Sequence, residues 1–344
     1  MINSRSFLSR LGRYPGLVWL MLLAFQVLAR ADDPSTKLIL VLGAEGEPEY
    51  GSNFLHQAVL WNSLGNQCGC AVAEIGTSGD QTTNDFDRLK LTLMAEPKEG
   101  LAQLWLVLIG HGTFDAQEAR FNLRGPDVSA SDLASWLEPF HRPVVVINGA
   151  SCSGPFLNKL SRTNRVIVTA TRSGSEQNFA RFGGFFAEAL GKAEADLDKD
   201  GQVSVLEAFL SASRQVAEWY KTEGRLATEH ALVDDNGDSL GTPADWFKGV
   251  RPTRIPTGGK LADGFRANQV CLSLSSMDRP LTAEQRSHRD SLEEALFKHR
   301  ERKSKLAEEE YYKVLESILL DLARVYRPLE TNNPPNSSPG RTGT

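Results

Sequence analysis

The stretch Leu104-Trp105-Leu106-Val107-Leu108-Ile109, which runs into Gly110-His111-Gly112, decides the fold of this chain. A run of consecutive apolar residues is typical of a strand buried on both faces, because a half-buried strand alternates apolar and polar residues. Similar short runs occur at 38–42, 70–75, 144–147 and 166–168, with helical patterns between them. Residues 37–250 are therefore predicted to form a doubly wound α/β domain, with a mostly parallel sheet and helices on both faces.

Chemically reactive residues follow two of these runs. Run 104–109 leads into His111, and run 144–147 leads into Ala150-Ser151-Cys152-Ser153-Gly154. The carboxyl ends of parallel strands lie at one edge of the sheet, so the histidine and the thiol are expected close together. A neighbouring base turns a thiol into a nucleophile, and a helix beginning near Pro155 would supply N–H groups to an oxyanion.

Two apolar blocks, one ending in His-Gly and one ending in a cysteine among small residues, resemble the caspase-like and legumain-like cysteine peptidases (clan CD). The likeness covers 37–250 and implies a caspase-like sheet. It also implies that His111 is the general acid/base and Cys152 the nucleophile, with the N–H groups of Gly112 and Cys152 as the oxyanion hole. Gly43-Ala44-Glu45-Gly46 resembles a legumain Gly-Ser-Asn-Gly, which implies that Glu45 stands where legumains have asparagine near the histidine.

Three positions depart from the family pattern. Alignment on Cys-x-Gly makes Cys152 the nucleophile, whereas alignment on Cys-x-Ser-Gly puts Ser151 in that place. Leu55-His56-Gln57-Ala58 resembles the legumain Arg-His-Gln-Ala, which implies that His56 contacts substrate. Leu55 replaces the arginine, so asparagine specificity does not carry over. Arg172 follows run 166–168, where it either forms a pocket wall for an acidic substrate residue or pairs with Glu176.

Residues 196–207 match the 12-residue EF-hand calcium loop. Gly201 stands at the turn and Val203 at the apolar position, with helical patterns on either side. A single loop of this kind predicts a structural Ca²⁺ site rather than a calcium sensor. The predicted ligands are Asp196, Asp198, Asp200, Gln202, Ser204 and Glu207. A second acidic stretch, 234–238, has Ser239 where the loop needs glycine, and it is predicted to be a simple turn.

The first 31 residues have the parts of a secretory signal: Arg5, Arg10 and Arg13, an apolar run at 17–29, and Ala29-Arg30-Ala31. The 13-residue run is shorter than the roughly 20 residues of a membrane span, so a secreted or periplasmic location without a stable membrane anchor is predicted. Residues 1–31 hold four arginines and no acid, so their removal lowers the net charge from −5 to −9. That charge disfavours nucleic-acid binding.

The chain has four cysteines, Cys68, Cys70, Cys152 and Cys271. Their spacing forms no disulfide framework, and the C-x-C pair at 68 and 70 is an unusual spacing for a disulfide or a zinc site. In an oxidising compartment one bridge from Cys68 or Cys70 to Cys271 is compatible with the sequence, and it would leave Cys152 free.

After residue 250 the composition changes. Residues 251–281 are predicted to be a linker, 282–327 one long charged helix, and 328–344 a disordered tail. Apolar residues recur every three or four positions near the end of that helix, at Tyr311, Leu315, Ile318, Leu322 and Val325. This seam predicts either docking on the main domain or helix-mediated self-association.

These features predict an exported cysteine endopeptidase that acts on peptide or protein substrates through a Cys-His dyad, with a structural calcium site. The alternative is a catalytically inactive caspase-like domain used for binding or scaffolding. A less favoured alternative is a serine hydrolase using Ser151 with a later histidine, His230.

Overall fold

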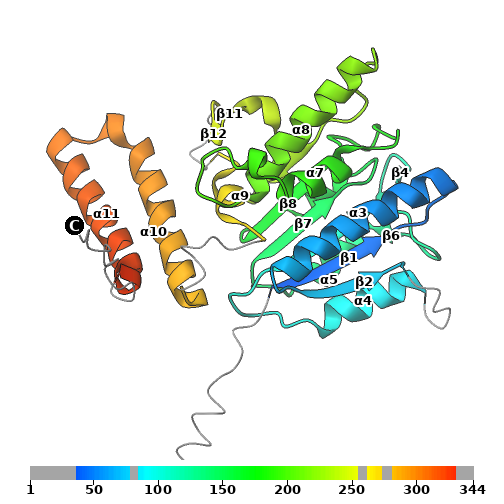
Figure 1. Cartoon of the computed structure of the whole chain (residues 1–344), viewed down its shortest axis with the longest axis horizontal. Coiled ribbons are helices and arrows are strands. Elements are labelled where there is room, and N and C mark those ends of the chain that lie inside the picture. The colour runs from blue at the N-terminus through cyan, green and yellow to red at the C-terminus, as the bar shows by residue number, and fades with distance from the viewer. Residues whose placement is uncertain (1–35, 78–83, 255–261, 273–280, 331–344) are drawn as a thin grey trace, which may run out of the picture. The chain divides into compact units, whose positions relative to one another are not determined.

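The computed structural model describes residues 36–77, 84–254, 262–272 and 281–330. Its central sheet has seven strands in the order β10-β9-β8-β7-β3-β1-β2 (Figure 1). Strands β2, β1, β3, β7 and β8 run parallel to one another. Strand β9 pairs antiparallel with β8, and β10 pairs antiparallel with β9. The strands are β1 (Lys37–Leu42), β2 (Ala71–Ile75), β3 (Leu104–Ile109), β7 (Val144–Asn148), β8 (Arg165–Thr169), β9 (Leu232–Asp234) and β10 (Thr242–Pro243). The predicted α/β class is confirmed.

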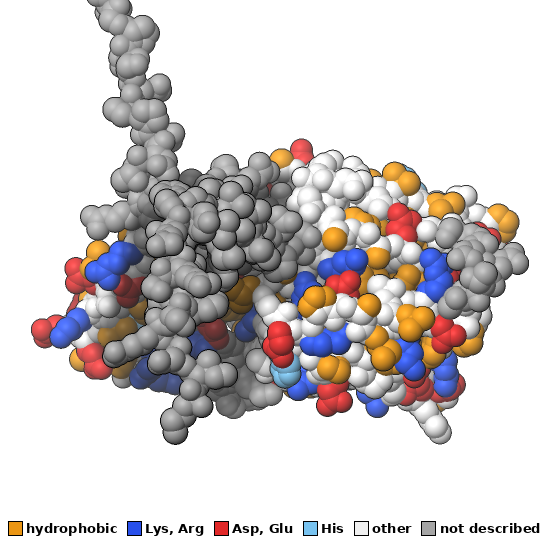
Figure 2. Space-filling view, turned by 90° about the horizontal axis from the view of Figure 1, so that it is seen from below, with side chains coloured by type: hydrophobic (Ala, Val, Ile, Leu, Met, Phe, Trp, Pro, Cys, Tyr) orange, Lys and Arg blue, Asp and Glu red, His pale blue; other side chains and the backbone are white. Residues whose placement is uncertain are grey.

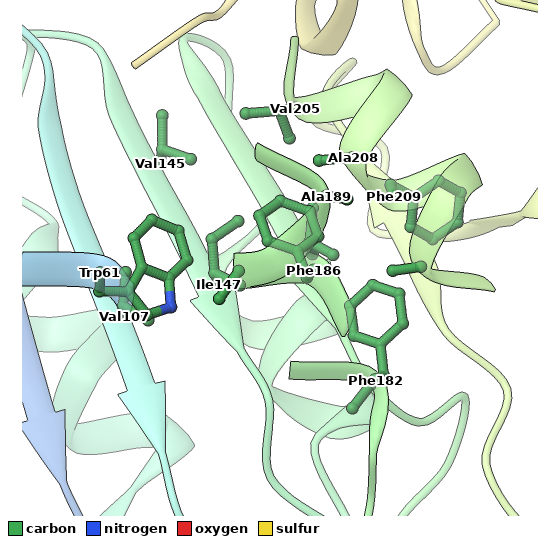
Figure 3. Close-up of a cluster of buried hydrophobic side chains, with 14 of the residues drawn as sticks. Trp61, Val107, Val145, Ile147, Phe182, Phe186, Ala189, Val205, Ala208 and Phe209 are labelled. Atoms are coloured by element: carbon green, nitrogen blue, oxygen red, sulfur yellow. The ribbon is translucent and has the colours of Figure 1, made fainter. Parts of the chain in front are cut away.

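Helices cover both faces of this sheet, and each face has its own apolar core. One core joins the sheet to α3 (Pro48–Gln67), α7 (Phe182–Leu190) and α8 (Val205–Thr222). Trp61, Ile147 and Phe186 meet in this core (Figure 3). The other core joins the sheet to α4 (Asp85–Ala95), α5 (Ala130–Leu137) and α6 (Gly154–Leu160). Strands β1, β3 and β7 contribute alternate residues to the two cores, which explains why their sequences are uninterrupted apolar runs.

Local sequence signals set where several helices begin. The Asn84 side chain accepts a hydrogen bond from the Asp87 N–H at the start of α4. Ser129 and Ser204 begin α5 and α8 with reciprocal capping boxes. Such caps satisfy N–H groups that have no partner within the helix.

A small second sheet follows β3. It consists of β4 (Gly112–Phe114), β5 (Ala119–Phe121) and β6 (Val128–Ser129), all antiparallel. Because β4 begins at Gly112, this sheet fixes the backbone immediately after His111. A third pair, β11 (Phe247–Lys248) and β12 (Arg251–Pro252), lies near the end of the main domain.

The prediction of one helix over 282–327 is wrong. The structure has α10 (Ala283–Glu301) and α11 (Glu308–Glu330), separated by a 3-10 turn at Lys303–Lys305. The two helices pack on one another, with the His299 Nε2 2.8 Å from the Tyr311 carbonyl and their rings stacked at 4.7 Å. The apolar seam of α11 includes buried Tyr311 and Val325, so the seam is used within this hairpin.

The predicted linker 251–281 also contains folded structure. Helix α9 (Phe265–Gln269) packs on α8, and its Ala267 is fully buried. Phe265 contacts Phe297 of α10 at a ring distance of 4.8 Å, which joins the hairpin to the domain. Short polar sequences can order in this way when tertiary contacts offset their weak local preference.

The predicted signal peptide and most of the predicted tail lie outside the described residues; 328–330 continue α11. No helix in the described part of the chain is long and apolar enough to cross a membrane. On the face shown in Figure 2, basic and acidic side chains are interspersed among apolar ones.

Candidate active site

His111 lies at the carboxyl edge of the sheet, between the end of β3 and the start of β4. Its ring makes edge contacts with Tyr50, Phe54 and Phe179, at centroid distances of 4.7, 5.2 and 6.0 Å. A hydrogen bond to the Glu45 backbone opposes the effect of burial, but burial dominates and lowers the pKa of His111. The imidazole is therefore neutral near pH 7, the form that acts as a base.

The aromatic residues around His111 were missed by the sequence analysis. Tyr50 and Phe54 are four residues apart in the first turns of α3, and Phe179 stacks on Tyr50 at 4.9 Å. The four-residue spacing puts both side chains on one face of a helix that starts where β1 ends. This signal was present in the sequence, but Phe179 comes from a distant loop and could be joined to it only by the fold.

Ser151 is the residue of the β7 loop that contacts the His111-Gly112 segment. Its Oγ lies 3.2 Å from the Gly112 nitrogen and 3.2 Å from the Gly112 carbonyl oxygen, and the residue is only 3% exposed. The parallel pairing of Leu108 with Asn148 brings these two loops together. A Cβ on Gly112 would overlap the Ser151 backbone carbonyl, so the contact depends on glycine there.

Cys152 occupies a different environment. It has a left-handed backbone (φ 54°), it is 1% exposed, and burial raises the pKa of its thiol. Its N–H donates to the Glu176 carbonyl at 2.9 Å. A left-handed non-glycine residue is strained, and such residues concentrate at functional sites. Burial with a raised pKa is nevertheless the opposite of what activates a cysteine.

The Cys-His dyad and its oxyanion hole stay predictions. Within the described residues, no hydrogen bond or ion pair joins His111 to Cys152 or to Ser151. The Gly112 N–H is within bonding distance of Ser151 Oγ, and the Cys152 N–H is bonded to Glu176. Both predicted oxyanion donors thus already have protein partners.

Glu45 and His56 are two further residues predicted for the site, and they stand in different relations to His111. Glu45 reaches His111 through its backbone, while its exposed carboxylate lies over Gly51 of α3. His56 is exposed on α3, about 200° around the helix from Phe54, which contacts His111. The structure therefore does not bring the side chain of His56 to the edge that holds His111.

Arg172 pairs with Glu176, one of the two alternatives raised by the sequence. Its Nε lies 3.2 Å from Glu176 Oε1, and the arginine side chain is 62% exposed. The same carboxylate is 2.6 Å from His230 Nδ1 and accepts hydrogen bonds from the Arg172 and His230 N–H groups. Glu176 thus fixes the loop whose carbonyl binds Cys152, and His230 is engaged with Glu176 rather than with a serine.

The predicted calcium loop brings three of its six predicted ligands to a common point. Single carboxylate oxygens of Asp196, Asp198 and Glu207 all lie within 4.8 Å of one another. Burial and the neighbouring acids raise the pKa of Asp200, which lies beside this group. Oxygen donors at these separations fit a calcium ion bonded at 2.3–2.6 Å.

Hydrogen bonds between residues that are close in the chain hold the backbone of the loop in place. Asp196 accepts from the Lys199 and Gly201 N–H groups, and Asp200 accepts from the Gln202 N–H. Ser204 caps α8, and its hydroxyl donates to Glu207 and lies 3.3 Å from Asn268 Oδ1.

The loop is enclosed by segments from the end of the chain. Asn268 of α9 donates to Asp198 at 3.3 Å, and the Val205 N–H donates to the Val270 carbonyl at 2.8 Å. Beside them is a pocket of about 300 Å³ that holds loop carboxylates on one side and Arg289 and Arg300 of α10 on the other. The calcium loop is therefore linked to the C-terminal hairpin through α9.

No protein-family model and no curated protein sequence matches the chain. Among solved structures, the chain is similar to protein GSU0716 from Geobacter sulfurreducens (11% identity, TM-score 0.38, covering 58% of this chain and 92% of that one). It is also similar to the Drosophila initiator caspase Dronc (12%, 0.39, 61% and 82%). A third similar structure is Chaetomium thermophilum Raptor (12%, 0.31), of which 18% is covered, against 46% of this chain.

Proposed function

We propose that this chain is a caspase-type domain that binds peptide or protein segments at the His111 edge and does not cleave them through Cys152. The observation that carries the proposal is the contact of Ser151 Oγ with both backbone polar atoms of Gly112. A nucleophile in such a site lies beside the histidine and the oxyanion donors. Here Ser151 borders the His111-Gly112 segment.

The state of the Cys152 thiol supports the same conclusion. Its burial and raised pKa keep it protonated near pH 7, and the protonated thiol is a poor nucleophile. A serine becomes a nucleophile only through a base within hydrogen-bonding reach. His111 instead bonds the Glu45 backbone and is held by aromatic side chains.

The aromatic group around His111 supports peptide binding. Tyr50 and Phe179 are both partly buried and stack on one another beside the imidazole. Such residues combine a large apolar surface with polar atoms, and they contribute strongly to binding interfaces.

The second candidate is cleavage by Cys152 with His111, as an exported cysteine endopeptidase. The neutral, oriented imidazole of His111 favours it. In this mechanism the thiol would lose its proton to His111 and attack the peptide carbonyl. His111 would then protonate the leaving amine, whose departure breaks the C–N bond and leaves an acyl-enzyme. Water activated by His111 would hydrolyse this thioester and release Cys152. It requires Cys152 to leave its buried, left-handed conformation.

Activity and labelling measurements separate these candidates. The full chain is incubated with a fluorogenic peptide library, with iodoacetamide and with a fluorophosphonate. Binding without turnover, and no rapid labelling of Cys152 or Ser151, is the expected result. Turnover that Cys152→Ala or His111→Ala abolishes would refute the proposal, and labelling of Ser151 by the fluorophosphonate would establish a serine hydrolase.

Two variants sharpen the test. Ser151→Cys places a thiol beside Gly112, and it should react with iodoacetamide roughly tenfold faster than Cys152. Tyr50→Ala should weaken binding of the best library peptide about tenfold, as expected for an interface aromatic. Val59→Ala, an exposed residue on the same helix, should leave that affinity unchanged. Equal loss in both variants would argue against binding at His111.

We further propose that loop 196–207 binds Ca²⁺ as a structural clamp and that residues 1–31 direct export. The converging oxygens of Asp196, Asp198 and Glu207 support the calcium site. Bound calcium would hold the loop against α9, because Asp198 and Ser204 both contact Asn268. Isothermal titration of the chelated chain with CaCl₂ should give one site, and no heat of binding would exclude it.

Export is tested separately by expressing the chain with residues 1–31 in a bacterial host and sequencing the amino terminus of the product. Cleavage after Ala31 and recovery outside the cytoplasm are expected. An intact Met1 in the membrane fraction would instead indicate an anchor.

A further inference from the structure

Cys68 and Cys70 lie at the carboxyl end of α3, the opposite end of this helix from Tyr50 and Phe54. This end forms a two-bond helix termination: the Cys70 N–H donates to the Gly65 carbonyl at 2.8 Å, and the Gly69 N–H to the Asn66 carbonyl at 3.2 Å. Gly69 between the two cysteines has φ +70°, the left-handed conformation that this termination requires. The chain therefore turns back on itself at Gly69.

This turn brings the two thiols together. The side chains of Cys68 and Cys70 are hydrogen-bonded to one another, and both are partly exposed. Gly65 lets the turn pack closely, because a Cβ there would approach Val72 at 2.8 Å and lie 3.9 Å from the Cys70 Cβ. Cys152 and Cys271, by contrast, are buried.

We infer that Cys68 and Cys70 form a reversible dithiol–disulfide site that exchanges with small disulfides of the glutathione type. The inference is independent of the proposed function, since it rests on the end of α3 alone. A C-x-C ring is small, so its disulfide is strained, and strained, exposed disulfides are the readily reduced, exchanging ones.

The two sulfurs have different roles. Hydrogen bonding to Cys68, then burial, raise the pKa of Cys70, so Cys70 keeps its proton and donates it toward Cys68. In the proposed exchange Cys68 makes the attack, because the thiol with the raised pKa, Cys70, is the weaker nucleophile. Cys68 attacks one sulfur of glutathione disulfide, breaks that S–S bond and releases one glutathione thiolate, which takes up a proton.

The second step closes the site. Cys70 loses its proton and attacks the Cys68 sulfur of the mixed disulfide, and the second glutathione leaves. The protein dithiol is oxidised by two electrons, and one glutathione disulfide is reduced to two thiols. The reverse sequence returns the dithiol, so no other oxidant or reductant is needed.

Trapping at defined redox ratios tests this inference. The full chain is reduced, equilibrated with reduced and oxidised glutathione over a range of ratios, quenched with acid and alkylated with N-ethylmaleimide. Peptide mass spectrometry then follows each cysteine. Cys68 and Cys70 are expected to lose alkylation together, with the loss of two hydrogens from one peptide, and native Cys68 should be alkylated roughly tenfold faster than Cys152.

Single variants identify the roles. Cys70→Ser should accumulate a glutathione mixed disulfide on Cys68, because the resolving thiol is missing, and Cys68→Ser should form no internal disulfide. The inference is overturned if both thiols stay alkylated even after equilibration with oxidised glutathione alone. It is also overturned if Cys68 or Cys70 pairs with Cys271 or with a second chain.

Discussion

Two acidic turns, residues 196–207 and 234–238, have similar composition but opposite arrangements. In the first, exposed or half-exposed carboxylates converge on one point and are joined there by the buried Glu207. In the second, Asp234 and Asp235 are buried, and each carboxylate makes its own separate contacts. Asp235 accepts hydrogen bonds from the Gly264 and Ala267 N–H groups, while Asp263 accepts from the Asp235 N–H.

The difference shows that acidic composition alone does not define a cation site. Converging carboxylates repel one another until a cation is present, whereas dispersed carboxylates are neutralised by N–H donors or by a proton. Burial and the nearby Asp235 charge raise the pKa of Asp263 to about 8, and burial also raises the pKa of Asp235. Asp263, beside the second turn, therefore retains its proton near pH 7.

The largest expected effect is that of Glu207→Ala, which removes the anchor of the first turn. Glu207 is 1% exposed and accepts hydrogen bonds from the Leu197 N–H, the Ser204 N–H and the Ser204 hydroxyl. Loss of this buried network should lower the free energy of unfolding by about 3 kcal/mol even in chelator, as measured by urea denaturation. Exposed Glu194→Ala is the control, with a change under about 0.5 kcal/mol. If the two changes lowered the free energy of unfolding equally, Glu207 would not be the residue that anchors the first turn.

The second-largest expected effect is a pH dependence of the free energy of unfolding, which arises at the second turn, residues 234–238. Asp263 has a folded pKa raised above its unfolded value of about 3.9, so the folded state binds more protons and stability falls as pH rises from about 4 through 8. The free energy of unfolding should therefore fall steadily between pH 5 and 8 and level off above pH 8. Asp263→Asn should flatten the profile, and a profile unchanged by this variant would contradict the shared burial of the two acids.

The smallest effect is the calcium-dependent one, and it compares the turns directly. At a calcium concentration tenfold above Kd, binding should stabilise the chain by about 1.4 kcal/mol, measured as a rise in Tm over the chelated sample. Asp196→Ala should abolish this rise. Asp238→Ala, which removes only an acceptor for the Leu240 N–H in the second turn, should preserve it. The distinction fails if Asp238→Ala also removes the calcium response.

The sequence determined the features that depend on neighbours along the chain. Uninterrupted apolar runs predicted the parallel strands, since a strand between two helical layers is buried on both sides. The Ser129 and Ser204 caps are likewise local. Of the four carboxylates that the spacing in 196–207 predicted as ligands, three converge, because a 12-residue loop with Gly201 at its turn fixes much of its own geometry.

Tertiary structure alone decided which side chain of Ser151-Cys152 borders Gly112. Successive residues leaving a strand point in different directions, so a shift of one residue exchanges a buried side chain for one in the site. That direction depends on the pairing of β3 with β7 and on the Glu176 carbonyl that holds Cys152. The hairpin of α10 and α11 was decided in the same way, since His299 and Tyr311 meet only when the chain reverses.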